Sequence, residues 1–155
     1  MNSTNYFNTF IEIAEDSPAT RGEIPPRKGD KKSEANLQFE MLSGHPYEFT
    51  SDDVLFAVFA LRNEIPPEEW AVQRALFFSK GQPCFRASPL TKTYGWGIHS
   101  NEAGKIAMYG VETAAYQQFV ADQGVIKKKA MRSKRASQSS VIKFWRMENS
   151  QDVSK

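Results

Sequence analysis

The chain has 155 residues, of which 40% are hydrophobic, and its 20 Lys and Arg nearly balance its 18 Asp and Glu. This length fits a single domain of ordinary size. There is no run of about 18 apolar residues that would cross a membrane and no signal-peptide pattern, so we expect a soluble, cytoplasmic protein. The single Cys excludes an intrachain disulfide, and with only two His it disfavours a structural zinc site.

Residues 1–44 predict a strand, a loop and a helix. Along residues 9–13, Thr and Ile alternate with Phe and Glu, a period of two that is typical of a strand. Residues 16–32 are rich in Pro, Gly and charge, which indicates a loop. Ser33 is a suitable N-cap for a helix that Gly44 would end.

Two more helices are predicted in the middle of the chain. Thr50 and Asp53 have the spacing of a capping box and precede an apolar run at residues 54–61. Pro67, which two Glu follow, is suited to the start of the next helix, and Gly81 would close it. We expect that helix to pack through Trp70, Leu76, Phe77 and Phe78.

The remaining pattern predicts a hairpin, a helix and a last strand. Between residues 94 and 99, large apolar side chains alternate with Gly or His, and residues 100–104 have the composition of a turn. Thr113 would cap a short helix, and residues 125–131 would form the last strand. The order β-α-α-α-β-β-α-β indicates an α+β fold, with helices packed on a small, mainly antiparallel sheet of about four strands.

Charge is unevenly distributed along the chain. Residues 1–79 hold 7 basic and 13 acidic side chains, net −6, whereas residues 80–111 hold 4 basic and 1 acidic, net +3. Residues 127–135 hold 6 basic side chains and no acidic one. If the strands in the two basic stretches are neighbours, their charges add on one side of the domain and attract anions.

Residues 80–99 are basic and rich in hydroxyl groups and contain no carboxylate, a composition that suits a phosphate or carboxylate ligand. Gly95, Gly97 and His99 would share one face of a strand, where a ligand could come close to the backbone. Alternatively, the glycines make room for a packing helix and the basic residues are solvated. The residues that we expect at the ligand are Lys80, Arg86, Ser88, Lys92, Tyr94, Trp96 and His99.

Cys84 and His99 are the only pair that could supply a nucleophile and its base. A thiol needs a neighbouring imidazole or positive charge to become a thiolate at neutral pH, and Arg86 would add to that field. The alternative is a buried, inert thiol.

Six cations form an electrostatic patch for phosphate or nucleic acid: Lys127, Lys128, Lys129, Arg132, Lys134 and Arg135. Alternatively, lysines on an edge strand only discourage aggregation. The paired carboxylates at residues 52–53 and 68–69 fall in first turns of predicted helices, where the helix dipole explains them. We therefore expect no metal site and no cofactor.

Four segments carry a resemblance to a known family: SKGQPCFRASPLTKTYGWGIHS, TSDDVLFAVFA, EIPP and KAMRSKRA. Over residues 4–136 the chain resembles a family of small, mostly bacterial proteins of unknown function. The resemblance implies one domain and carries over no activity, cofactor or site. We expect a single domain at 1–136 and a Ser-rich, flexible extension at 137–155, in which Val141 to Met147 would contact a protein partner.

The leading functional hypothesis is a binding module for an anionic ligand, a phosphorylated metabolite or nucleic acid, near the hairpin. The first alternative is a thiol-dependent enzyme that uses Cys84 and His99. The second is an interaction subunit without catalytic activity.

Overall fold

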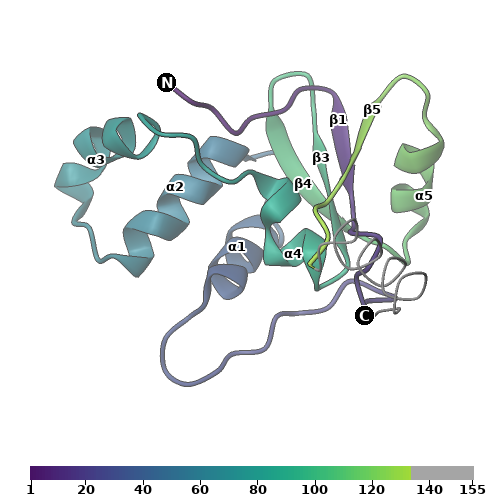
Figure 1. The fold of residues 1–155 in the computed structure, drawn as a ribbon, viewed down its shortest axis with the longest axis horizontal. Helices are drawn as coiled ribbons and strands as arrows, with labels where there is room; N and C mark the ends of the chain where they lie inside the picture. Colours follow the sequence, from purple (N-terminus) through teal and green to yellow (C-terminus); the bar gives the residue numbers. More distant parts are fainter. Residues whose placement is uncertain (134–155) are drawn as a thin grey trace, which may run out of the picture.

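The computed structural model describes residues 1–133, and in them five strands form one sheet in the order β2-β4-β3-β1-β5 (Figure 1). The strands are β1 Thr9–Glu12, β2 Phe49–Thr50, β3 Trp96–Ser100, β4 Lys105–Gly110 and β5 Ile126–Lys129. All pairs are antiparallel except β1 with β5. The α+β prediction is confirmed, with five strands instead of about four. The missed strand, β2, has two residues and is too short to show a period.

Helices cover both faces of the sheet. They are α1 Glu34–Leu42, α2 Ser51–Arg62, α3 Trp70–Phe77, α4 Pro89–Lys92 and α5 Ala114–Ala121, with 3-10 turns η1 Pro67–Glu69 and η2 Phe85–Ala87. In Figure 1, α5 lies on one side of the sheet, α1 and α4 lie on the other, and α2 leads away to α3 at the far end. None of these helices has the length and apolar character needed to cross a bilayer, a statement limited to residues 1–133.

Local side-chain caps start the main helices where the sequence predicts them. The side chains of Ser33 and Thr50 each accept a hydrogen bond from the backbone N–H three residues later. The side chains of Asn36 and Asp53 accept one from the backbone N–H of Ser33 and Thr50, which completes each capping box. Thr113 caps α5 through the backbone N–H of Tyr116. These contacts span three residues, so they can be recognised without the tertiary structure.

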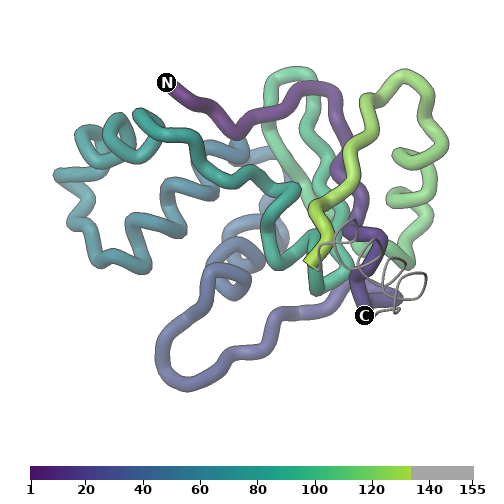
Figure 2. Tube along the Cα trace, in the orientation of Figure 1, coloured from purple at the N-terminus to yellow at the C-terminus, as the bar shows by residue number. Residues whose placement is uncertain are grey.

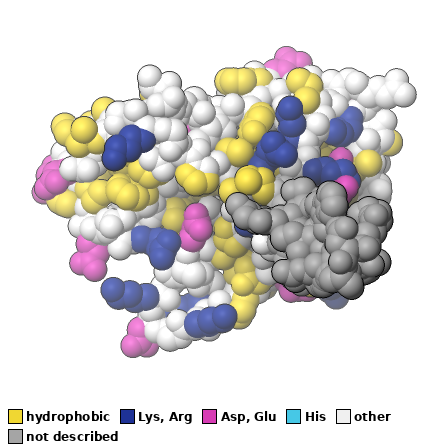
Figure 3. Space-filling model, viewed as in Figure 1, with side chains coloured by type: hydrophobic (Ala, Val, Ile, Leu, Met, Phe, Trp, Pro, Cys, Tyr) yellow, Lys and Arg dark blue, Asp and Glu magenta, His cyan; other side chains and the backbone are white. Residues whose placement is uncertain are grey.

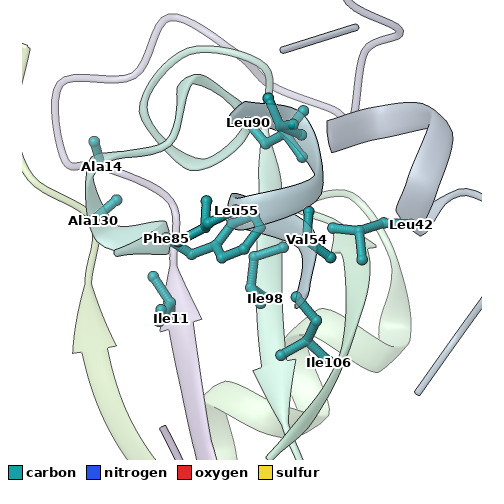
Figure 4. Close-up of a cluster of buried hydrophobic side chains, with 11 residues drawn as sticks. Ile11, Ala14, Leu42, Val54, Leu55, Phe85, Leu90, Ile98, Ile106 and Ala130 are labelled. Atoms are coloured by element: carbon teal, nitrogen blue, oxygen red, sulfur yellow. The ribbon is translucent and has the colours of Figure 1, made fainter. Parts of the chain in front are cut away.

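The core on the α1, α2 and α4 side is mainly aliphatic (Figure 4). Ile11 of β1 is paired with Ile98 of β3, and both side chains are about 1% exposed. Against them pack residues from the helices and from η2, among which Val54, Leu55, Phe85 and Leu90 are labelled in Figure 4. Burial of side chains this size contributes about 1.5 to 3 kcal/mol each.

The core on the α5 side is aromatic. Phe10 of β1 is fully buried, with its ring 4.9 Å from that of Tyr116 and 5.0 Å from that of Phe119. The Tyr116 hydroxyl accepts a hydrogen bond from the backbone N–H of Ile13, and burial raises the pKa of Tyr116 to about 12. β1 is therefore buried on both faces, although its sequence alternates like a half-exposed strand.

Residues 2–5 fasten the start of α2 to the rest of the domain. The Asp52 carboxylate is 2% exposed and accepts hydrogen bonds from Ser3 Oγ, at 2.8 Å, and from the backbone N–H of Thr4, at 2.7 Å. A third donor is Thr4 Oγ1, at 2.6 Å. These donors, together with the helix dipole, offset the cost of burying the charge.

The segment between β1 and α1 is the predicted loop, and in Figure 2 it runs out from the sheet before it returns to α1. Its early part is tied to β3, because Trp96 Nε1 donates to the Glu23 carbonyl at 2.8 Å. The Trp96 ring lies so close to Gly22 that a Cβ there would meet it at 2.8 Å. Trp96 therefore has a structural contact in place of the predicted ligand contact.

The third predicted helix is α3, and its packing differs from the expectation. Phe78 is 1% exposed, and Trp70 and Phe77 are half-buried. The prediction is wrong for Leu76, which is 58% exposed. Apolar periodicity marks the residues that could be buried, but here nothing in residues 1–133 covers the outer side of α3.

Candidate functional site

η2 brings Cys84 and Arg86 to one edge of the sheet. Phe85, between them, is 1% exposed in the aliphatic core, so its neighbours on the short turn face outward. The Tyr6 hydroxyl lies 3.4 Å from Cys84 Sγ. Burial raises the pKa of Tyr6, and the charge of nearby Arg86 acts in the opposite direction.

Arg86 is also fastened to the outer edge of β5. Its Nε donates to the Lys129 carbonyl at 2.7 Å, and its own carbonyl accepts from the Met131 N–H at 2.7 Å. Lys128 is opposite Ile11 in the β1–β5 register, which places it on the aliphatic side of the sheet, where η2 also lies. Figure 3 shows Lys and Arg side chains close together over β5 and the segment before α4.

We call the group formed by Tyr6, Arg86, Lys128 and Lys129 the β5 basic surface. Arg86 uses its Nε–H on the Lys129 carbonyl and also interacts with the Tyr6 hydroxyl, so within residues 1–133 the remaining N–H donors of the guanidinium are available. Within residues 1–133, Lys128 makes no ion pair. These two cations are therefore the ones best placed to receive an anion.

Other members of the predicted patch are already engaged. Glu15 pairs with Arg132 at 2.6 Å and with Lys129 at 3.7 Å, and the hydrogen bond and charge of Arg132 lower the pKa of Glu15. Lys127 Nζ donates to the Asp122 and Val125 carbonyls. Lys134 and Arg135 lie outside the described residues. The block of six cations is thus partly neutralised within the fold.

The two basic stretches are not adjacent in the sheet. β1 lies between β3 and β5, so the hairpin is separated from the lysines of β5. Glu12 of β1 stands opposite Lys129 in the register and adds negative charge there. The charges of the hairpin and of β5 therefore do not sum as expected.

The other residues predicted at the ligand are dispersed. Lys80 follows α3, at the far end of the molecule from β5. Ser88 is 3% exposed and caps α4, with its hydroxyl donating to Gln38 Oε1. Lys92 ends α4, and Tyr94 follows it before β3. Of the predicted set, only Arg86 lies in the β5 basic surface.

His99 lies on the opposite side of the sheet from Cys84. Its neighbour Ile98 faces the aliphatic core that holds Phe85, and alternation along β3 sends His99 to the α5 side. There its ring stacks on Phe119, with centroids 4.1 Å apart. The predicted nucleophile and base are therefore not brought together.

A short chain of hydroxyl groups leads to His99. The Tyr47 hydroxyl is 2.8 Å from His99 Nδ1 and 2.8 Å from the Tyr109 hydroxyl. Burial lowers the pKa of His99, although the charge of Asp122 opposes this, and burial raises the pKa of Tyr47 above its ordinary value. Partial burial thus favours the neutral form of the imidazole.

The predicted ligand floor beside Gly97 is occupied by the protein itself. A Cβ at Gly97 would meet the Phe10 ring at 2.5 Å and the Tyr116 ring at 2.7 Å. Gly95, with φ of +82°, lies against the backbone of Arg21, whose carbonyl would be 2.2 Å from a Cβ. Both glycines permit close packing, which is the alternative that the sequence left open.

Sequence reasoning missed three tyrosines that contact the candidate residues. The position of Tyr109 could have been inferred from the predicted hairpin, because a turn at 100–104 places Tyr109 opposite Gly97 and on the same side of the sheet as His99. Tyr47 and Tyr6 come from segments remote in sequence, and no local pattern connects them to His99 or Cys84.

Three cavities lie among the helices and loops away from β5. One of about 410 Å³ is lined by residues including Leu55, Phe59 and Phe77, and one of about 330 Å³ by residues including Phe59, Leu76 and Lys80. The third, of about 610 Å³, lies beside the loop at 27–32. In the described part of the chain, no three His, Cys, Asp or Glu side chains gather as metal ligands.

These features define a small α+β domain with a mostly antiparallel five-stranded sheet and a basic edge. A family model described as a family of unknown function, DUF6157, matches residues 1–136, and the chain belongs to that family. The resemblance expected from the sequence is thereby confirmed. A search of curated proteins and a search of solved structures each found no match.

Proposed function

We propose that this protein is a binding module for a phosphate-bearing ligand, which it holds at the β5 basic surface. The observation that carries the proposal is the fastening of Arg86 to the Lys129 carbonyl, on the same side of the sheet as Lys128, which makes no ion pair with any residue in 1–133. A guanidinium fork that is held in place binds phosphate oxygens in pairs, and an adjacent ammonium adds a point charge. The proposal moves the ligand from the hairpin to the edge strand β5.

The shared chemistry of the ligand is the phosphate group, and its source is either a nucleic acid or a small metabolite. The two sources differ in how they bind an exposed edge. A nucleic acid places several phosphates along it, so binding weakens steeply with salt, with a slope of about −2 in log units when two to three cations are engaged. Lys128 and Lys129 are exposed on the outermost strand of the sheet, where a polymer can lie along them, and this favours the nucleic acid.

The test is a salt titration with three probes: a labelled single-stranded oligonucleotide, the matching duplex, and a nucleoside triphosphate. Arg86→Gln combined with Lys128→Gln is expected to weaken binding at least about tenfold at low salt. The matched control, Lys28→Gln with Lys31→Gln, removes the same charge from the exposed loop before α1. It is expected to change the affinity for the probes less than about twofold. Absence of binding to all three probes, or equal losses in both double variants, would refute the proposal.

A thiol-dependent enzyme receives less support. A base beside Cys84 would have to accept its proton, and the residue in contact is Tyr6, whose pKa burial raises. A phenol in that state stays protonated at neutral pH and does not serve as a base. The third hypothesis, a partner contact through Val141 to Met147, falls on residues outside the described part of the chain.

A further inference from the structure

The outer side of α3 is apolar and uncovered. Six of the eight residues of α3 are apolar, yet none is buried. Val72 is 65% exposed and Leu76 is 58% exposed, and Leu61, at the end of α2, is 51% exposed. Figure 3 shows hydrophobic side chains at the surface over α2 and α3. A cluster of exposed apolar side chains of this kind is typical of an interaction surface.

Contacts on its inner side fix the orientation of α3. Arg74 pairs with Asp53 of α2 at 3.0 Å and lies 5.6 Å from the centre of the Phe78 ring. Residues 72 and 76 are four apart and share a face of the helix, whereas residue 74 is on the opposite face. Because Arg74 faces α2, Val72 and Leu76 are directed away from the domain.

A hollow lies beside the exposed face of α3 that holds Val72 and Leu76. The cavity of about 330 Å³ is lined by Leu76 and Lys80 together with Phe59, Gln73, Phe77 and Gln82. The larger cavity of about 410 Å³ shares three of these residues, so the two hollows adjoin. An apolar side chain from a partner can enter this hollow and cover the half-buried rings of Phe59 and Phe77.

The charges at the two ends of α3 are opposite in sign, which favours a second copy of the same helix as the partner. Glu68 and Glu69 are exposed before its first turn, and Lys80 is exposed after its last. When two copies of α3 pack antiparallel about an axis at residue 74, Val72 meets Leu76 of the second copy. Residues 68 and 80 are each six positions from residue 74 in the sequence and lie at opposite ends of α3, so this arrangement brings the Glu68 end of one copy to the Lys80 end of the other. The exposed face of α3 is thus apolar at its centre and carries opposite charges at its two ends, so it is complementary to itself in charge.

We propose that the protein forms a symmetric dimer through α3, with the two helices antiparallel. A single short helix and its neighbouring hollow make a small interface, so the dimer is weak and reversible. A symmetric pair requires the same patch on both copies, which is the condition that the Glu68 and Lys80 positions satisfy. The interface is at the opposite end of the molecule from β5, so it leaves the β5 basic surface open.

Sedimentation of the full chain over a concentration series, from about 5 to about 500 µM, tests the proposal. The expected result is a rise in mass toward that of a dimer. Leu76→Glu is expected to keep the chain monomeric throughout, because it places a carboxylate in the apolar contact. The matched control is Ile24→Glu, which makes the same kind of change at a side chain that is 74% exposed and distant from α3. It is expected to dimerise like the parent.

Charge exchange tests the antiparallel arrangement. Glu68→Lys or Lys80→Glu alone would place like charges together and is expected to weaken the dimer about threefold or more. The double variant restores the pairs and is expected to recover most of the parent affinity. A parent chain that stays monomeric, whether or not another protein binds α3, overturns the proposal. So does a Leu76→Glu variant that dimerises normally, or a double exchange that recovers nothing.

Discussion

The two faces of the sheet are built from neighbouring residues of the same strands, yet they pack in different ways. Under α1, α2 and α4 the side chains are mainly aliphatic, with Ile11 against Ile98. Under α5 they are aromatic, with Phe10 filling the space that Gly97 leaves. Several helices cover the aliphatic face, whereas the aromatic face depends on the single helix α5 and on the absence of a side chain at Gly97.

The largest expected effect comes from removing the ring that fills the aromatic face. Phe10→Ala is expected to lower the free energy of unfolding by about 4 kcal/mol, and Ile11→Ala, on the other face, by about 3 kcal/mol. The measurement is urea denaturation followed by circular dichroism. The control is Phe7→Ala, because Phe7 is 55% exposed. If Phe10→Ala costs no more than this control, α5 does not form a core with the sheet.

Gly97→Ala is expected to have the next largest effect on stability, because the added methyl group would overlap the Phe10 and Tyr116 rings. Overpacking of this kind costs about 2 kcal/mol, seen as a lower midpoint in thermal or urea unfolding. The matched control is Gly81→Ala, since nothing lies within 4 Å of a Cβ there. Equal stability of the two variants would show that the Phe10 and Tyr116 rings can move to accept the methyl group. The aromatic face would then not depend on the glycine at position 97.

Removal of one hydroxyl tests the polar part of the aromatic face. Tyr47→Phe breaks the hydrogen bonds to His99 and Tyr109 and is expected to destabilise the fold by about 1 kcal/mol. Tyr94→Phe serves as the control, because the Tyr94 hydroxyl has no hydrogen bond within residues 1–133. An indistinguishable pair of unfolding curves would mean that the chain of hydroxyl groups contributes nothing to stability.

The smallest expected effect is a dependence of stability on pH. Burial lowers the pKa of His99 below its ordinary value of 6.5, so the unfolded chain binds more protons than the folded one between these two values. The contribution of His99 is therefore fully present above pH 6.5 and is lost as the pH falls through the folded pKa. Chemical denaturation at a series of pH values is expected to show a shallower slope for His99→Gln than for the parent.

His45→Gln is the control for that slope, since His45 is exposed and away from α5. If His99→Gln and the parent lose stability in parallel as the pH falls, His99 is not the source of the dependence, and the aromatic face has no titrating group of consequence.

Most of the elements could be predicted because their signals are local. The caps at Ser33, Thr50 and Thr113 and the hairpin turn each involve residues within a few positions of one another. The 3-10 turn η2 and the four-residue helix α4 were missed, because both are too short to show a helical period. β2 was missed for the same reason of length.

Less of the candidate site could be predicted, because its members meet through long-range packing. Arg86 reaches β5 only because Phe85 is buried against the aliphatic face of the sheet and because β5 pairs with β1. Tyr6 joins it from the other end of the chain. Proximity in sequence suggested instead that residues 80–99 form one group, and the fold distributes them over the molecule.

The sequence by itself determined the α+β class, the helix starts, the hairpin and the position of the basic block, because periodicity, capping and charge are properties of short segments. Only the tertiary structure decided what that charge meets. β1 lies between the hairpin and β5, so the two basic stretches stay apart. Among residues 1–133, Glu15 pairs with Lys129, the Lys129 carbonyl holds Arg86, and Lys128 has no ion pair. Strand order is set by which apolar faces can be buried together, and no single segment contains that information.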